Sequence, residues 1–422
     1  MKLACANTNQ ASIAIMVNAH DISANPLFGA ALAPRRPRVT AYLTTDLAAA
    51  GRSWAQLEQN PDASFHQSRA WVGAWAGGTG MPVSVITLDQ DGQTLAVLPL
   101  EIANVGGLRI ARFAGTAFSN ANTGLVADAC LPDDAITAAD LTEALARAGL
   151  NADIMLFDKM PPDAVNRPPF ARLPRVLHQN PSFQLPLFEN FQDVLAQING
   201  KRRRKKFRQS ERRLEAIGGY RHITGDDDEQ AMRLLETFLK QKPTRLAAQG
   251  LPNVFADPGV RSFLARLAMS RDASGEAALE LHGIELAGGE HEGAVIAVAG
   301  LTRKQGHVTC QFGSIDETIA ADASAGELLF YRMIERAAKA GERVFDFGVG
   351  DQPYKRSWCP VRTDLVDCYL PLTLKGRFAA PLIAAAISAK RVIKSSPSLK
   401  RIAALLRGMT VRESAAARPD SD

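Results

Sequence analysis

The sequence predicts a mixed α/β fold in which one arrangement of strands and a helix occurs twice. Three short apolar runs separated by glycine turns lie within residues 82–115, and three more lie within residues 278–313. Each set is followed by a helical segment and then by another apolar run. Hairpins followed by a helix-connected strand give a sheet with both antiparallel and parallel neighbours. We therefore expect two related α/β units in tandem.

Both copies contain the same elements in the same order. The first has three hairpin strands, a helix and a further strand, expected at 82–88, 94–100, 108–115, 141–148 and 153–158. The second has the same series, expected at 278–286, 294–301, 307–313, 326–340 and 343–347. Glycine-containing dipeptides, such as Asp91-Gly92 and Gln305-Gly306, separate the hairpin strands and predict tight turns. The repeated order indicates an internal duplication with divergent sequences.

Other elements connect and follow the two copies. Residues 161–186 are rich in proline and are expected to form a linker that ends in a short strand. Helices are expected next at 201–217, 227–242 and 258–269. The first of these helices would carry Phe207, Leu214 and Ile217 on one apolar face. Basic amphipathic helices are expected near the end of the chain, at 379–393 and 399–406.

These elements divide the 422-residue chain into four expected regions. They are a poorly ordered segment at 1–40, a first α/β unit at 41–195, a second at 196–375 and a basic tail at 376–422.

Charge is distributed unevenly along the chain. The net charge is +5, but residues 201–213 hold nine basic residues and one acid, and residues 375–412 hold nine basic residues and no acid. The rest of the chain is therefore net acidic, and the two cationic patches require anionic partners. For residues 201–213 a solvated or membrane-contacting face is the simplest interpretation. A nucleic acid is not expected, because stacking aromatic residues and reading motifs are missing there.

Composition excludes several other classes of protein. The five cysteines form no CxxC pair or His/Cys cluster, so we expect reduced thiols and no metal site. No apolar run approaches the length of a membrane span, and no secretory signal is evident at the N-terminus. A cytoplasmic protein is the expectation.

The most informative segment is 344–358, a buried strand that opens into a glycine and proline turn. Such turns commonly carry the chemistry of α/β sheets. This one delivers a dense set of functional side chains, namely Asp346, Asp351, Tyr354, Lys355 and Trp358.

Several segments together resemble a known family. They are the tandem units, the arginine-rich helix before Leu214, and the segments 65–75, 97–100, 313–316, 324–329 and 345–358. In these features the chain resembles the CelD-like branch of the GNAT acetyltransferases, found near cellulose and exopolysaccharide biosynthesis and related to FemAB-type aminoacyl transferases. The resemblance covers roughly residues 54–374. It implies a degenerate first unit, an active second unit, an acyl-CoA donor, and an amine or hydroxyl acceptor on a small molecule or a glycan precursor.

The resemblance also implies roles for individual residues. Tyr354 would protonate the leaving thiolate, Lys355 would hold an oxyanion or a phosphate, and Asp346 or Asp351 would accept the proton of the acceptor. For Asp351 the alternative is capping of its own turn. Trp358 would pack in the core or form a platform for the substrate.

Donor and acceptor contacts are expected elsewhere in the second unit. A helix begins near Ser324, so that residue, Gly326, Glu327 and Leu328 would bind the phosphates of the donor. The alternative is that Ser324 is an ordinary N-cap. Asp316 would face the same cleft, and Arg204 of the basic helix would contact a phosphorylated substrate.

Two further polar residues and the basic tail complete the set of expectations. Glu280 and His282 lie on a predicted strand where the resemblance allows a catalytic base, but a lone polar residue on a strand is expected to face solvent. The tail would contact an anionic membrane surface, or pack on the protein with its charges in water.

The rival to an acyltransferase is a non-catalytic scaffold at a membrane polysaccharide synthase. That rival is favoured by the missing Gln/Arg-x-x-Gly-x-Gly/Ala phosphate loop.

Overall fold

The computed structural model describes residues 39–128, 136–272 and 274–396. The chain divides into two units, Met1–Arg36 and Pro37–Asp422, and the described residues all belong to the second. The segment 1–40, expected to be poorly ordered, lies outside the described residues except for its last two positions. The expected helix at 399–406 also lies outside them.

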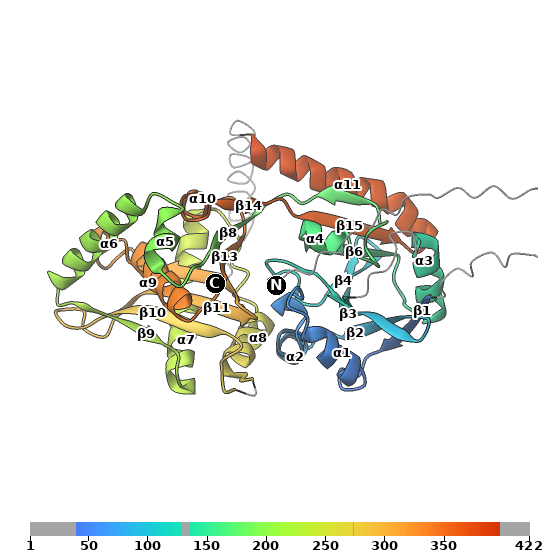
Figure 1. Ribbon diagram of the computed structural model, residues 1–422, viewed down its shortest axis with the longest axis horizontal. Helices are drawn as coiled ribbons and strands as arrows, with labels where there is room; N and C mark the ends of the chain where they lie inside the picture. Colours follow the sequence, from blue (N-terminus) through green and yellow to red (C-terminus); the bar gives the residue numbers. More distant parts are fainter. Residues whose placement is uncertain (1–38, 129–135, 273, 397–422) are drawn as a thin grey trace, which may run out of the picture. The chain divides into compact units, whose positions relative to one another are not determined.

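The first sheet is built mainly from the first half of the chain (Figure 1). Its strands, in spatial order, are β1 (Val39–Thr44), β2 (Val83–Gln90), β3 (Gln93–Val105), β4 (Leu108–Phe113), β6 (Ile154–Met160), β15 (Val366–Pro371) and β7 (Arg175–Leu177), with β5 (Leu125–Val126) paired to β3. The hairpin β2–β3 closes through Asp91 and Gly92, both with positive φ, as a two-residue hairpin turn requires.

The second sheet repeats this plan. Its strands, in spatial order, are β14 (Val361–Thr363), β8 (Ser182–Pro186), β13 (Val344–Val349), β12 (His307–Ile315), β11 (Val295–Lys304), β10 (Glu280–Leu286) and β9 (Tyr220–Thr224). Gln305 and Gly306, again with positive φ, close the hairpin β11–β12.

Each sheet contains one parallel pair, connected by a helix. Helix α3 (Ala138–Arg147) connects β4 to β6, and α9 (Ala325–Lys339) connects β12 to β13. The remaining neighbours in both sheets are antiparallel. The prediction of a mixed α/β fold, with one plan used twice, is therefore confirmed.

Sheet membership does not follow the expected division at residue 195. Strand β8 precedes that position but pairs with β13 and β14 of the second sheet. Strand β15 follows it but pairs with β6 and β7 of the first sheet. Each half thus contributes one strand to the sheet of the other half. The proline-rich segment 161–186 is also more than a linker, because it contains α4 (Pro162–Val165), β7 and β8.

Three helices were expected near the middle of the chain, and α6 (Gly200–Glu215) and α8 (Pro258–Met269) begin and end close to the expected residues. Helix α7 (Asp228–Ala248) continues past its expected end at residue 242, and α5 (Phe191–Ala196) was not expected. Ile217 was expected on the apolar face of α6, but it follows the end of the helix and is 41% exposed. The last described helix, α11, covers Leu374–Ser395 and begins earlier than expected.

The two halves share a hydrophobic core. Helices α1 (Gly51–Glu58) and α2 (Arg69–Thr79) contribute Trp54, Trp71 and Trp75 to the same cluster as Phe238 of α7 and Phe263 of α8. The ring of Phe263 makes edge contacts with Trp71 and Trp75, at centroid distances of 4.9 and 5.3 Å. Among the described residues, no helix is long and apolar enough to span a membrane.

Candidate active site

The parallel strands β12 and β13 separate part of the way along their length. They pair only from His307↔Val344 to Thr309↔Asp346. Beyond that point the N–H of Val349 donates instead to Oδ1 of Asn120, at 3.1 Å, from a loop of the first half. Gly348 permits this approach, because a Cβ there would lie 2.1 Å from Asn120 Oδ1.

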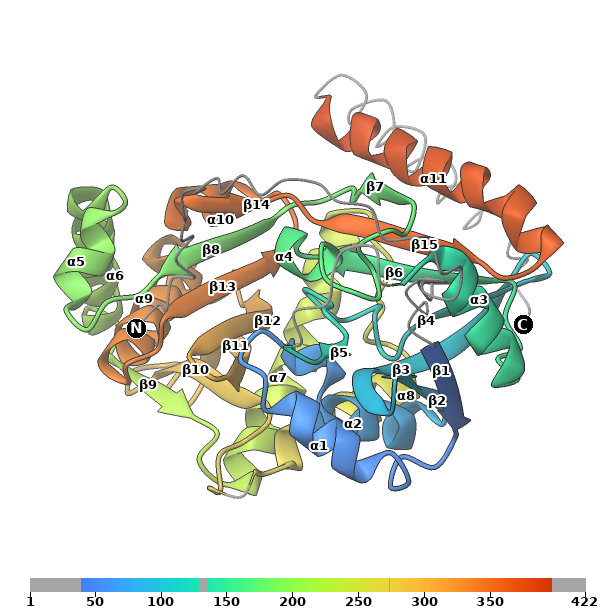
Figure 2. The same ribbon diagram turned by 45° about the vertical axis from the view of Figure 1, so that its right-hand side comes forward.

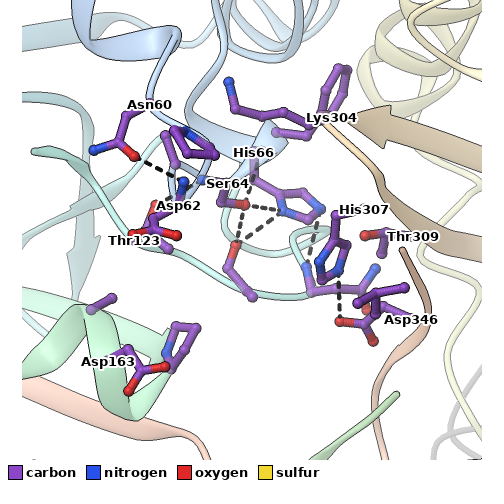
Figure 3. Close-up of a pocket in the computed structure, with 18 of the residues that line it drawn as sticks. Asn60, Asp62, Ser64, His66, Thr123, Asp163, Lys304, His307, Thr309 and Asp346 are labelled. Atoms are coloured by element: carbon purple, nitrogen blue, oxygen red, sulfur yellow. Dashed lines mark hydrogen bonds and ion pairs between the residues drawn. The ribbon is translucent and has the colours of Figure 1, made fainter. Parts of the chain in front are cut away.

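A cavity of about 520 Å³ lies beside the paired ends of these strands. Its lining comes from both halves: residues 60–66 and 120–126, the segment around α4, and the starts of β12 and β13. Figure 3 shows His307, Thr309 and Asp346 on one side of this cavity, with His66 and Ser64 nearby.

Asp346 is a buried carboxylate, and both of its oxygens accept hydrogen bonds. Its Oδ1 accepts from Ser182 Oγ at 3.0 Å and from the Gly348 N–H at 2.6 Å. Its Oδ2 accepts from Gln184 Nε2 at 3.0 Å and from His307 Nε2 at 3.2 Å. Burial alone would raise the pKa of Asp346, but the hydrogen bonds, that of His307 foremost, hold this pKa below its ordinary value. Asp346 is therefore ionised at neutral pH.

His307 completes a histidine–carboxylate pair at the cavity. Its side chain is 40% exposed, whereas that of Asp346 is 4% exposed. Because an ionised carboxylate only accepts hydrogen bonds, Nε2 of His307 carries the proton in this contact, and Nδ1 is the ring nitrogen that can accept one. A buried carboxylate that orients an accessible imidazole is the arrangement of a general base.

His66 connects the two halves and has no free ring nitrogen. Its Nδ1 donates to Ala121 O at 3.0 Å, and its Nε2 accepts from the Asn120 N–H at 3.3 Å. Nε2 also accepts from Gln311 Nε2 of β12 at 3.0 Å, and Gln311 Oε1 accepts from Asn120 Nδ2 at 2.8 Å. Burial lowers the pKa of His66 to about 4, so the ring is neutral at pH 7. His66 is therefore placed to hold the structure together rather than to transfer protons.

Two cations line the cavity and have no carboxylate partner among the described residues. Lys304 donates to the carbonyl of Glu58, and Arg343 donates to Gln305 O at 2.7 Å. Within the described residues neither makes an ion pair, whereas Arg167, also in the lining, is paired with Asp62. The cavity can thus offer positive charge to an anionic group next to His307.

Of the catalytic residues expected from the sequence, only Asp346 lines this cavity. Lys355 is buried and donates to Gly348 O and Val349 O at 3.1 and 2.8 Å, and burial lowers its pKa to about 8. Tyr354 stacks on Phe330, and burial raises its pKa. Asp351 is paired with Arg356 at 2.8 Å. These three lie around α10 (Pro353–Trp358) and β13, outside the cavity lining.

The residues expected to contact the donor are arranged differently from a phosphate loop. Ser324 precedes α9 with a φ of 55°, and its side chain makes no capping hydrogen bond, so it is not the ordinary N-cap that was the alternative. Its carbonyl accepts from the N–H groups of Glu327 and Leu328, at 3.0 and 3.2 Å. Leu328 is buried in the core, and a Cβ on Gly326 would meet Ile315 at 2.8 Å. The N–H groups of Glu327 and Leu328 are therefore hydrogen-bonded to Ser324 and are not free to bind a phosphate.

Glu327 supplies negative charge where a phosphate was expected. Its carboxylate pairs with Arg203 at 2.6 Å and Lys206 at 3.7 Å, and it accepts from Trp358 Nε1 at 3.1 Å. Trp358 is fully buried under the Arg203 guanidinium, which excludes the role of an open platform.

The two remaining expected contacts are local. Asp316 accepts from the N–H of Thr318 at 2.8 Å, and half-buried Arg204 donates to Gln192 Oε1 at 3.0 Å. Neither lines the cavity.

The expectation that Glu280 and His282 face solvent is wrong for His282. His282 is fully buried, with Nδ1 3.1 Å from His222 Nε2 and Nε2 3.3 Å from Glu280. Glu280 is half-buried and pairs with Arg303 at 2.6 Å. Among the described residues, no group of three or more His, Cys, Asp or Glu side chains is arranged to hold a metal ion.

Sequence reasoning missed His307, Gln184 and Asn120 as parts of the site. A signal for His307 was available, because it begins the strand that pairs in parallel with the strand of Asp346. Gln184 and Asn120 arrive from the other half, and no sequence spacing indicated that.

The fold and the site define a class of protein. Two mixed sheets, each with a helix-connected parallel pair, form a tandem of GNAT-like units, and the His307–Asp346 pair lies on the second sheet. Residues 201–356 match the sequence model of the acetyltransferase (GNAT) domain. This match indicates an acyltransferase-type domain in this part of the chain. No match was found among curated protein sequences.

Similar solved structures include the crystal structure of FemX, with a TM-score of 0.53 and 14% identity over 78% of this chain and 97% of FemX. A tandem GNAT protein from the clavulanic acid biosynthesis pathway has a TM-score of 0.42 and 11% identity over 79% of this chain and 99% of its own. L-PGS from Bacillus licheniformis has a TM-score of 0.45 and 10% identity over 80% of this chain and 96% of its own. At these identities the likeness to FemX concerns the fold alone.

Proposed function

We propose that this protein is an N- or O-acyltransferase in which His307 is the general base and Asp346 orients it. The observation that carries the proposal is the 3.2 Å contact between His307 Nε2 and the buried carboxylate, at the edge of a cavity of about 520 Å³. The proton of an acceptor amine or hydroxyl would pass to Nδ1 of His307 while the acceptor forms a bond to the acyl carbon. The imidazolium would then return the proton to the leaving group of the donor.

The acceptor is proposed to carry a phosphate or a carboxylate. Lys304 and Arg343 support this, because they line the same cavity and make no ion pair within the described residues. The resemblance to CelD-like proteins would place such an acceptor among glycan or cell-envelope precursors in the cytoplasm, including those of exopolysaccharide and cellulose biosynthesis.

The donor is proposed to be acyl-CoA, with an aminoacyl ester as the FemAB-like alternative. The N-terminus of α9 does not fit a pyrophosphate, because the Glu327 carboxylate in its first turn places negative charge where the phosphates would bind. We therefore derive no donor contact there. The same observation favours the second candidate function, a non-catalytic scaffold at a membrane polysaccharide synthase.

The test compares turnover and ligand binding in variants of the full chain. With a panel of acyl-CoA donors and amine acceptors, His307→Gln should lower kcat about 10²- to 10⁴-fold, because the base is removed. Asp346→Asn should lower it as well. His291→Gln, which changes an exposed histidine outside the cavity, should leave kcat unchanged.

Two results would count against the proposal. Unchanged turnover in His307→Gln, with the circular dichroism spectrum intact, would remove the assigned base. Absence of turnover together with absence of acyl-CoA binding by calorimetry would support the scaffold instead.

A further inference from the structure

Helix α11 is fixed to the protein by one narrow face. Figures 1 and 2 both show it alongside β15 and β7, and it packs against both strands. Gly376 brings the backbones together, because a Cβ there would lie 1.9 Å from Asp153 O. Thr373 caps the helix by accepting from the Gly376 N–H, and Arg391 donates to His178 O at 3.1 Å. These contacts fix which side of α11 faces away from the protein.

The outward side of α11 is apolar. Leu374, Phe378 and Leu382 are 70%, 78% and 72% exposed, the highest values for large hydrophobic side chains among the described residues. Their spacing of four residues places them on one stripe of the helix. Five of the fourteen exposed large hydrophobic side chains of the described residues lie on this helix. Among the described residues, the most exposed large hydrophobic side chains therefore lie together on this helix.

Exposed cations border the stripe on both sides. At about 100° per residue, Arg377 lies on one side of the stripe, and Lys375 and Lys390 lie on the other. Residues 375–412 contain no aspartate or glutamate. An apolar stripe between cations, without acids, matches the chemistry of a surface of anionic lipids, where each cation contributes about 1 kcal/mol. A second copy of the chain would present the same positive charge and be repelled.

We propose that α11 lies flat on an anionic membrane surface, with Leu374, Phe378 and Leu382 inserted at the boundary between headgroups and acyl chains. Lys375, Arg377 and Lys390 contact the headgroups on either side. The small-residue face of α11 remains packed on the first sheet, so the whole protein is held at the membrane. This surface is separate from the cavity and does not depend on the proposed reaction.

The test is flotation of the full-length protein with lipid vesicles. The protein should float with phosphatidylcholine vesicles that contain 30% phosphatidylglycerol, on the order of the anionic content that binds basic helices, and not with pure phosphatidylcholine. The double variant Phe378→Glu/Leu382→Glu should lose at least tenfold in binding, because two charges enter the apolar stripe. The matched control Tyr42→Glu/Val105→Glu changes two similarly exposed side chains on β1 and β3 and should bind as the wild type does.

A second variant tests the proposal even if Phe378→Glu/Leu382→Glu does not fold. Lys375→Glu/Lys390→Glu alters only exposed side chains and should weaken binding to anionic vesicles, with an unchanged thermal midpoint. Equal binding to neutral and anionic vesicles, or full binding by a folded Phe378→Glu/Leu382→Glu variant, would overturn the proposal. So would a dimer in sedimentation experiments that this variant converts to a monomer without any vesicle binding, because a second copy would then cover the stripe.

Discussion

At the scale of single residues, His66 shows how burial and fixed partners determine the state of a side chain. A backbone carbonyl can only accept, so Nδ1 carries the proton toward Ala121, and a backbone N–H can only donate, so Nε2 accepts from Asn120. The Val349 N–H orients the amide of Asn120 in the same way. A protonated His66 would have to break one of these contacts. Burial, with a smaller contribution from the nearby Lys159 cation, holds the pKa of His66 at about 4.

The stability of the protein should therefore fall in acid because of His66. The folded pKa is about 4 and the unfolded pKa about 6.5, so the unfolded chain binds the proton first. The stabilisation is complete above pH 6.5 and is lost as the pH falls toward 4, by about 3 kcal/mol in total. Urea unfolding at pH 7 and pH 4.5 should show a loss in the wild type that is about 2–3 kcal/mol larger than in His66→Gln. An equal loss in both proteins would contradict this account, and exposed His291→Gln serves as the control.

At the scale of elements, the start of α9 is held by a buried ion pair. Arg203 of α6 is buried with its guanidinium 4.0 Å above the Trp358 ring, and Glu327 in the first turn of α9 supplies the countercharge. A carboxylate in the first turn also suits the helix dipole. The pair thus connects α6, α9 and α10 at a place where the sequence alone was compatible with phosphate binding.

Removing the carboxylate of Glu327 should strongly lower the free energy of unfolding. Glu327→Ala leaves the buried Arg203 cation without its partner, and we expect a loss of about 3–5 kcal/mol in the free energy of unfolding. Glu335→Ala removes a similarly exposed carboxylate on the same helix, whose partners Lys339 and Arg332 are more exposed than Arg203, and should cost less than about 1 kcal/mol. Urea midpoints of the two variants provide the comparison. Similar small losses in both would show that the buried pair is not a significant source of stability.

At the scale of the whole described structure, the two halves cannot separate without breaking both sheets. Strand β8 belongs to the second sheet and β15 to the first, so each half completes the other. The core beneath α2 and α8 is also shared, with Phe263 against Trp71 and Trp75. The cavity has the same origin, because Gln184 reaches Asp346 only through the exchanged strand β8.

Unfolding should therefore be a single cooperative transition rather than two. Phe263→Ala removes a buried ring shared by both halves and should cost about 3–5 kcal/mol. Calorimetry should show one peak in the wild type and one peak, shifted to lower temperature, in the variant. Two resolved transitions, with only one of them shifted by Phe263→Ala, would show that the halves fold independently.

The elements were more predictable than the site. Strands with glycine turns, such as those around Asp91-Gly92, and helices with clear boundaries, such as α8, depend on neighbouring residues and were found within a few positions. Ile217 was misplaced because the helix ends before it. For the site, Asp346 lines the cavity, but the catalytic role expected for it stays a prediction, as do the roles expected for Tyr354, Lys355 and Asp351, which do not line it.

The sequence by itself determined the order of elements, the duplicated α/β plan and the basic character of α6 and α11, because periodicity, turns and charge are local properties. Only the tertiary structure decided the partner of Asp346, the position of Glu327 at the start of α9, and the outward direction of Phe378. These depend on strand exchange and on packing between residues far apart in the chain. Such contacts are set by the free energy of burying whole surfaces together, which no short segment encodes.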